Sequence, residues 1–164
     1  MKTHENLTSE ELSFAVFCIE NLAERLNIDA TELYPLLTEK SNILYDYIIP
    51  CYESLHTQGK DYILDDIIDV MNERGVPAVS ESSDKIEKEQ ITMTANPILL
   101  QRKYARVIEL FAEKANISTR AALDFFYRSE EYDMMRRGVS DLHCMSDDYL
   151  AEDLLEEWTE KKAS

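Results

Sequence analysis

The sequence repeats itself, and this repetition constrains the fold more than any other feature. The segment beginning at Leu55-His56 recurs at Leu142-His143, and identical Leu, His, Asp, Tyr and Asp residues lie 87 positions apart, as in 143 − 56. A second matched set, Ile, Glu, Ala, Glu, Asn and Ile, begins at Ile19 and recurs 89 positions later at Ile108. Repetition at a fixed period indicates that one structural unit occurs more than once. The sequence therefore predicts two homologous copies.

Helical periodicity dominates both copies. Apolar residues recur every three or four positions from Leu12 to Leu26 and again from Leu99 to Ala115, which is the pattern of an amphipathic helix. Only three glycines and four prolines occur in 164 residues. We predict an all-α fold with two homologous small helical bundles of about four helices each. The predicted core includes Ile19, Leu22, Ile67, Ile108, Phe111 and Leu154.

Local signals place the copies and their helices along the chain. We expect copy one at residues 8–75, a polar linker at 76–96 and copy two at 97–160. Side chains suited to capping a helix start, and a proline suited to a first turn, mark several beginnings. These are Thr8, Asp29, Ser41, Asn96 with Pro97, Ser118 and Ser146. Residues 51–56 are expected to be a connector, with a helix from Lys60 to about Glu73 after it and a last helix through Trp158.

The charge narrows the range of partners. The formal net charge is −16, from 17 Lys and Arg against 33 Asp and Glu. Such a field repels phosphate, so it disfavours nucleic acid and anionic membranes and favours a basic protein. Three cysteines without a CxxC motif are typical of a reduced intracellular protein. The chain shows neither a signal-peptide pattern nor an apolar run long enough to span a membrane, so we expect a cytoplasmic protein.

Three stretches of the second copy are distinctive: KYARVIE at 103–109, AALDFFY at 121–127 and LHCMSD at 142–147. They resemble a small bacterial helical family, the domain of unknown function numbered thirty-seven ninety-one. The first copy, with IIP at 48–50 and LHTQGK at 55–60, resembles a sister branch of that family. The resemblance implies a compact helical domain with no established enzymatic activity. Family members are often encoded beside a protein resembling an ADP-ribosyltransferase-type toxin, which implies an antitoxin-like or accessory role.

Two repeated positions are candidates for chemistry. His56 and His143 recur just before the last helix of each copy, and Cys144 stands beside one of them. A metal site needs three or four converging ligands, and the copies do not share a matched cysteine. We therefore interpret both histidines as structural and predict no metal and no cofactor. Asp66 and Asp153 are likewise interpreted as structural members of the repeat signature.

The candidate partner-binding residues are aromatic or basic. Tyr62 and Tyr149 occupy matched positions, and their spacing does not follow the core stripe cleanly. Arg102, Lys103 and Arg106 form the main basic group, which either binds an acidic partner or pairs within its own helix with Glu109 and Glu113.

These features favour a non-catalytic protein-interaction module, with an antitoxin-like partnership to an ADP-ribosyltransferase-type protein implied by the resemblance. A small helical transcription regulator is one alternative, which the net charge disfavours. An enzyme that uses His143 and Cys144 is the other alternative, and no phosphate-binding loop or Ser/His/Asp pattern supports it.

Overall fold

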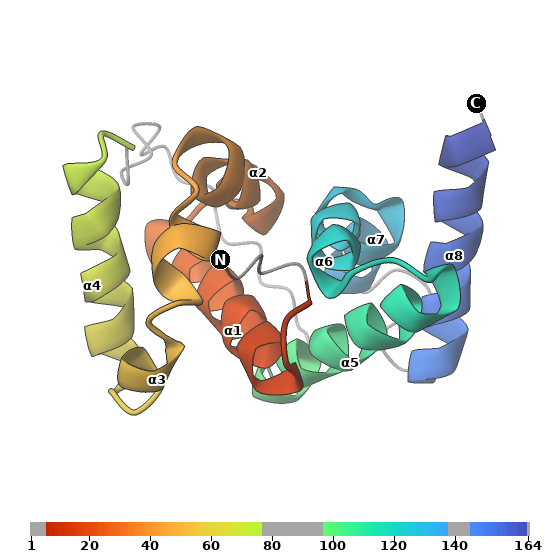
Figure 1. The fold of residues 1–164 in the computed structure, drawn as a ribbon, viewed down its shortest axis with the longest axis horizontal. Coiled ribbons are helices and arrows are strands. Elements are labelled where there is room, and N and C mark those ends of the chain that lie inside the picture. The colour runs from red at the N-terminus through yellow and green to blue at the C-terminus, as the bar shows by residue number, and fades with distance from the viewer. Residues whose placement is uncertain (1–5, 77–96, 138–144, 164) are drawn as a thin grey trace. The chain divides into compact units, whose positions relative to one another are not determined.

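The computed structural model describes residues 6–76, 97–137 and 145–163. Every regular element in these ranges is a helix, as Figure 1 shows, so the prediction of an all-α fold is confirmed. Backbone contacts divide the chain into two compact units. The described part of the first-copy unit is residues 13–76, and that of the second-copy unit is residues 6–12, 97–137 and 145–163. The predicted boundaries at 75 and 97 stay a prediction. Of the predicted linker only Val76 is described, and it is buried. Residues 77–96, with the predicted Asn96 cap, lie outside the described residues.

The helices follow one order in the two segments predicted to be copies, which we continue to call the first and second copy: a long helix, short helices, and a second long helix. The first copy contains α1 (Ser9–Leu26), α2 (Ala30–Pro35), the π-helical turns η1 (Leu36–Lys40) and η2 (Leu44–Ile48), α3 (Tyr52–Leu55) and α4 (Lys60–Glu73). The second copy contains α5 (Pro97–Ala115), α6 (Thr119–Arg128), α7 (Glu130–Arg137) and α8 (Asp147–Ala163). Two sequence expectations were wrong, because residues 52–55 form a short helix rather than a plain connector and α8 continues past Trp158.

The two long first helices end in the same way. Asn27 and Asn116, which are matched in the repeat, both adopt a left-handed backbone with a φ of 59°. The following amide of Ile28 donates to the carbonyl of Ala23 at 3.0 Å, and the amide of Ile117 donates to that of Ala112 at 3.0 Å. This arrangement satisfies helix carbonyls that would otherwise lack a donor and turns the chain sharply. The repeated Ala, Asn and Ile residues therefore encode a helix stop.

The residue two places after each asparagine starts the next helix. Asp29 accepts a hydrogen bond from the amide of Thr31 at 3.4 Å, and Ser118 accepts one from the amide of Ala121 at 3.1 Å. Both caps have extended backbones. Because each stop is followed directly by a cap, the second helix begins as soon as the chain has turned.

The copies differ where the repeat offset changes from 89 to 87. In the first copy α2 passes into η1, where wider π-helical turns follow Pro35, and Asn42 has a left-handed φ of 56° before η2. In the second copy α6 ends at Arg128 and α7 begins at Glu130. Single π-helical turns commonly hold an extra residue within a helix. The π-helical turns therefore accommodate the two additional residues of the first copy, and the order of the helices after them is the same in both copies.

The predicted core residues Ile19, Leu22, Ile67, Ile108, Phe111 and Leu154 are all fully buried, so that prediction is confirmed. The second-copy unit has an aromatic centre, in which the Tyr104 ring lies 5.4 Å from the rings of both Phe126 and Tyr132. Phe111 of α5 lies 5.5 Å from Phe125 and 6.0 Å from Trp158 of α8, measured between ring centroids. Aromatic side chains thus join the first and last helices of this unit.

Truncating Phe111 tests this packing. We expect Phe111→Ala to lower the free energy of unfolding of the second-copy unit by about 3–5 kcal/mol, because a fully buried ring is replaced by a cavity. Trp158 is the chain's single tryptophan and packs on Phe111, so its fluorescence in a denaturant titration reports on this unit. Leu99→Ala is the control because Leu99 is 61% exposed. A loss below about 1 kcal/mol in Phe111→Ala would contradict the packing described.

Candidate functional site

Ion pairs between residues at matched positions join the first helix of each copy to its last helix. Arg25 lies at the end of α1, and its guanidinium contacts Asp65 of α4 at 2.5 Å and Asp61 at 3.7 Å. Lys114, its counterpart 89 residues later, contacts Asp148 of α8 at 3.0 Å and Glu152 at 3.5 Å. The acidic partners are matched as well, at an offset of 87. The same ion-pair fork therefore occurs in both copies with different residue types.

Tyr62 and Tyr149 lie beside these forks, in the first turns of α4 and α8. Their side chains are 58% and 49% exposed. Together with Leu99, they are the large hydrophobic residues most open to solvent in the described part of the chain. The two predicted aromatic positions therefore lie on the surface, one on each copy.

The Asp66 carboxylate accepts a hydrogen bond from the hydroxyl of Tyr47 in η2. That bond raises the pKa of the Tyr47 phenol above its ordinary value, because the donated proton stabilises the neutral phenol beside a carboxylate. Asp66 thus ties α4 to the short helix that precedes it. This contact accounts for a carboxylate at that position without catalysis.

Asp153, the counterpart of Asp66, faces a different group. Glu131 of α7 is only 4% exposed, and its Oε2 is buried without a hydrogen-bond partner. Burial, followed by the charge and hydrogen bond of Asp153 and the charge of Glu157, raises the pKa of Glu131 to about 7. Two carboxyl groups can share a hydrogen bond only when one is protonated. A proton on Glu131 would let it donate to Asp153, and this pair would then join α7 to α8 below about pH 7.

Glu157 supports the same junction from α8. Its carboxylate accepts the backbone amides of Glu130 at 2.9 Å and Glu131 at 3.4 Å, at the N-terminus of α7. Lys161 contacts Glu157 at 3.3 Å. A carboxylate at a helix start satisfies amides that have no partner within the helix. Sequence reasoning missed Glu131, although its place directly before the buried Tyr132 in a short amphipathic helix was a signal that it could be buried.

The stability of the second-copy unit should therefore depend on pH. The pKa of Glu131 is raised in the folded chain, so the folded state keeps a proton that the unfolded state loses between about pH 4.5 and pH 7. The free energy of unfolding should fall across this window. Glu131→Gln does not titrate, so it should not lose this stability. The difference in the free energy of unfolding between Glu131→Gln and wild type should therefore shift in favour of the variant by about 1–3 kcal/mol from pH 5 to pH 8.

Trp158 fluorescence in urea titrations at pH 5, 6, 7 and 8 measures this difference. Glu130→Gln is the matched control, because Glu130 precedes Glu131 on the same helix and is exposed. The control should follow the wild-type pH profile. Parallel profiles for wild type and Glu131→Gln would show that Glu131 does not titrate in this range.

His56 lies at the end of α3. Its Nδ1 is 2.7 Å from the carbonyl oxygen of Tyr52, and its ring stacks on the Tyr52 ring with centroids 4.3 Å apart. Tyr52 in turn meets the edge of Phe14 at 5.3 Å. Through these contacts His56 holds the end of α3 against the rings of Tyr52 and Phe14. Its counterpart His143, with Cys144, lies outside the described residues.

The basic group on α5 is engaged within the second-copy unit. Lys103 Nζ lies 2.9 Å from Asp147, and Arg106 Nε lies 2.6 Å from the same carboxylate at the start of α8. Partial burial works to raise the pKa of Asp147, but the hydrogen bonds from Arg106 and Lys103 outweigh it and hold the pKa below its usual value. Arg102 is exposed. Lys103 and Arg106 therefore position α8 on α5, and the helix partners Glu109 and Glu113 expected from spacing are not their contacts here.

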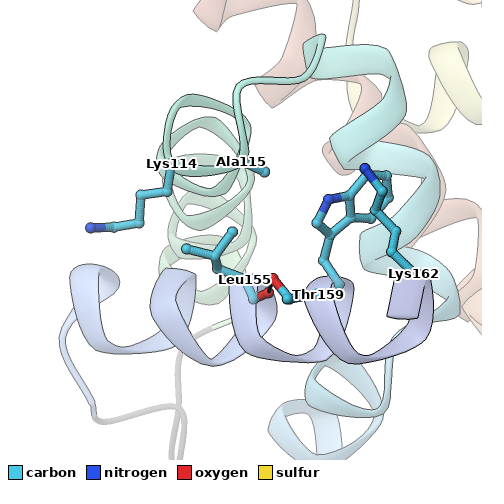
Figure 2. A pocket seen from close by; sticks show the side chains of 6 residues that line it. Lys114, Ala115, Leu155, Thr159 and Lys162 are labelled. Carbon is cyan, nitrogen blue, oxygen red and sulfur yellow. Dashed lines mark hydrogen bonds between the residues drawn. The ribbon is translucent and has the colours of Figure 1, made fainter. Parts of the chain in front are cut away.

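A shallow hollow of about 350 Å³ lies between the C-terminal halves of α5 and α8. Figure 2 shows Leu155 between the two helices. The Lys162 ammonium lies 5.4 Å from the centroid of the Trp158 ring, and Lys114 already contacts Asp148 and Glu152. The ammonium groups of Lys114 and Lys162, at the rim of the hollow, therefore contact neighbouring side chains instead of pointing into the hollow.

Within residues 6–76, 97–137 and 145–163, no three His, Cys, Asp or Glu side chains converge as metal ligands would. Of the cysteines in those ranges, Cys18 is fully buried in α1, and burial raises the pKa of its thiol. None of the described helices combines the length and the apolar character needed to cross a membrane.

Comparisons with known proteins agree with the resemblance in the sequence. Residues 13–74 match the family described as "Protein of unknown function (DUF3791)". This match covers the first copy from within α1 to the C-terminal end of α4. No curated protein and no solved structure matches the chain. Residues 13–74 of this chain are therefore similar to this family of unknown function.

Proposed function

We propose that this chain is a non-catalytic protein-interaction module made of two homologous helical copies. The observation that carries the proposal is the pair of exposed tyrosines at matched positions, Tyr62 and Tyr149. An exposed tyrosine adds nothing to a core, and tyrosine is among the residues that contribute most to binding when a partner covers it. Its presence at the same place on both copies favours a shared binding role.

Matched contacts support the duplication on which this proposal depends. Asn27 and Asn116 share one backbone conformation, and Arg25 and Lys114 make the same fork of ion pairs. Unrelated helical segments would have no reason to place these features at constant offsets. The second copy thus has the same helix stop and the same ion-pair fork as the first copy, which matches the family.

Charge supports a basic partner. α4 carries five acidic residues and one lysine, and α8 carries seven acidic residues and two lysines. The field of a protein with a net charge of −16 attracts a basic surface and speeds its association. Two copies in one chain also allow one partner to be held at two places, which raises the effective concentration of the second contact. The family resemblance makes a neighbouring ADP-ribosyltransferase-type protein the partner to test first, with this chain in an antitoxin-like role.

Removing both tyrosines tests the proposal. Tyr62→Ala with Tyr149→Ala should weaken the complex with the neighbour-encoded protein at least tenfold, because two aromatic contacts are lost. The stability of the chain should change by less than about 0.5 kcal/mol per site, since both rings are largely exposed. Co-expression, co-purification and calorimetry of the purified pair measure both effects.

Leu99→Ala removes a comparably exposed apolar side chain at an unmatched position and should leave the affinity unchanged. If wild type forms no complex at low salt and does not relieve toxicity in co-expressing cells, this partnership is wrong. Equal affinities of wild type and the double variant would instead remove the tyrosines from the interface.

A further inference from the structure

One exposed face of α4 is repeated on α8. On α4 it consists of Tyr62, Asp65, Asp69 and Glu73, at successive intervals of three, four and four residues. On α8 it consists of Tyr149, Glu152, Glu156 and Glu160, each 87 residues later. All eight residues are exposed. These intervals place each set along one side of its helix, and we call this side the tyrosine-acid face.

The charge of this face is kept between the copies while the residue type changes. Aspartate becomes glutamate from Asp65 to Glu152 and from Asp69 to Glu156, yet each position stays acidic. Exposed positions can usually change with little effect on stability. Because these two positions keep a negative charge in both copies although the residue type differs, the pattern indicates that the charge itself is required.

Helix stability does not explain these charges. Acidic residues four apart, as in Asp65, Asp69 and Glu73, repel one another by roughly 0.2–0.5 kcal/mol per pair. Glu73 is the last residue of α4, close to the negative end of the helix dipole, and that helix has no basic residue in its last turn. Only the first acidic position of each face meets the ion-pair fork, at Asp65 and Glu152. On α4 the rest of the face therefore lowers the stability of its own helix.

The geometry points away from a bound metal ion. Residues 62 to 73 of a helix span roughly 16 Å, so the carboxylates form a line and cannot converge on one ion. A line of negative charge with an aromatic ring at one end matches a line of positive charge on a partner. Side chains three and four residues apart on a second helix repeat at the same spacing as these carboxylates.

We infer that each tyrosine-acid face binds a basic helix of a partner protein, about three turns long, with arginines or lysines at three- and four-residue intervals. The carboxylates pair with the cations, and the tyrosine ring receives a guanidinium or an aliphatic stem at the end of the row. This inference rests on the proposed function and adds the chemistry of the partner and a stoichiometry of two basic helices per chain.

The test uses the full chain and two designed helical peptides of identical composition. In one peptide the arginines recur at three- and four-residue intervals on one face, and in the other they are scattered around the helix. Calorimetry should give two patterned peptides per chain, bound at least about tenfold more tightly than the scattered peptide. Affinity should fall as salt rises. Equal binding of the two peptides would show attraction by net charge alone and would overturn the inference.

Paired variants locate the binding. Asp69→Asn with Glu156→Gln removes one charge from each face and should weaken binding of the patterned peptide by about three- to fivefold. Glu24→Gln with Glu113→Gln is the matched control, because these exposed glutamates are also equivalent in the repeat and lie on the first helices. The control should stay within about twofold of wild type. An equal loss in both variants would exclude the face as the site.

The same variants separate this inference from the proposed function. If the partner protein binds the Asp69→Asn, Glu156→Gln variant as tightly as wild type, the inference is wrong while the interaction role stands. If the patterned peptide behaves as expected and the neighbour-encoded protein does not bind, the face is supported and that partner is excluded.

Discussion

The left-handed turn at Asn27 and Asn116 is the constraint on which the rest of each unit depends. A side chain with a Cβ is disfavoured in this backbone region, and asparagine tolerates it better than most residues. The turn reverses the chain within one residue and lets the next helix start at Asp29 or Ser118. Only then can the short helices and the last helix return to the apolar face of the first helix. A helix that continued straight would leave that face in water.

Around this turn the two cores use different side chains. Leu22 is matched by Phe111, and Leu37 by Phe126, and all four are fully buried. Two buried rings of the second-copy unit, Phe111 and Phe126, therefore stand where the first copy has leucines. Packing requires apolar side chains that fill the available volume, and several sets can do so. Differences in the core are thus compatible with one helix order.

The last helix of each copy faces two environments. Its inner side meets the core and the preceding short helix, through Ile67 and Asp66 in one copy and Leu154 and Asp153 in the other. Its outer side carries the tyrosine-acid face. The inner carboxylates are explained by contacts within the chain, whereas the charges along the outer face of α4 oppose the stability of that helix. This contrast separates structural acidic residues from those that support a binding role.

The sequence by itself determined the helices, most of their ends and the buried apolar positions. These follow from periodicity and from capping residues such as Ser118, whose effects act over a few neighbouring residues. The exception was α3 at residues 52–55, because so short a helix has no full apolar period to reveal it. The repeat offsets also identified Tyr62 and Tyr149 as special, but not their exposure.

Only the tertiary structure decided which polar groups meet. Lys103 and Arg106 bind Asp147, 44 and 41 residues away, and Glu131 faces Asp153 across two helices. Such pairings depend on how helices pack, and no local pattern in the chain specifies that packing. The same packing buries Glu131 and leaves the tyrosine-acid face in solvent, because each helix places one side against the core and the other in water.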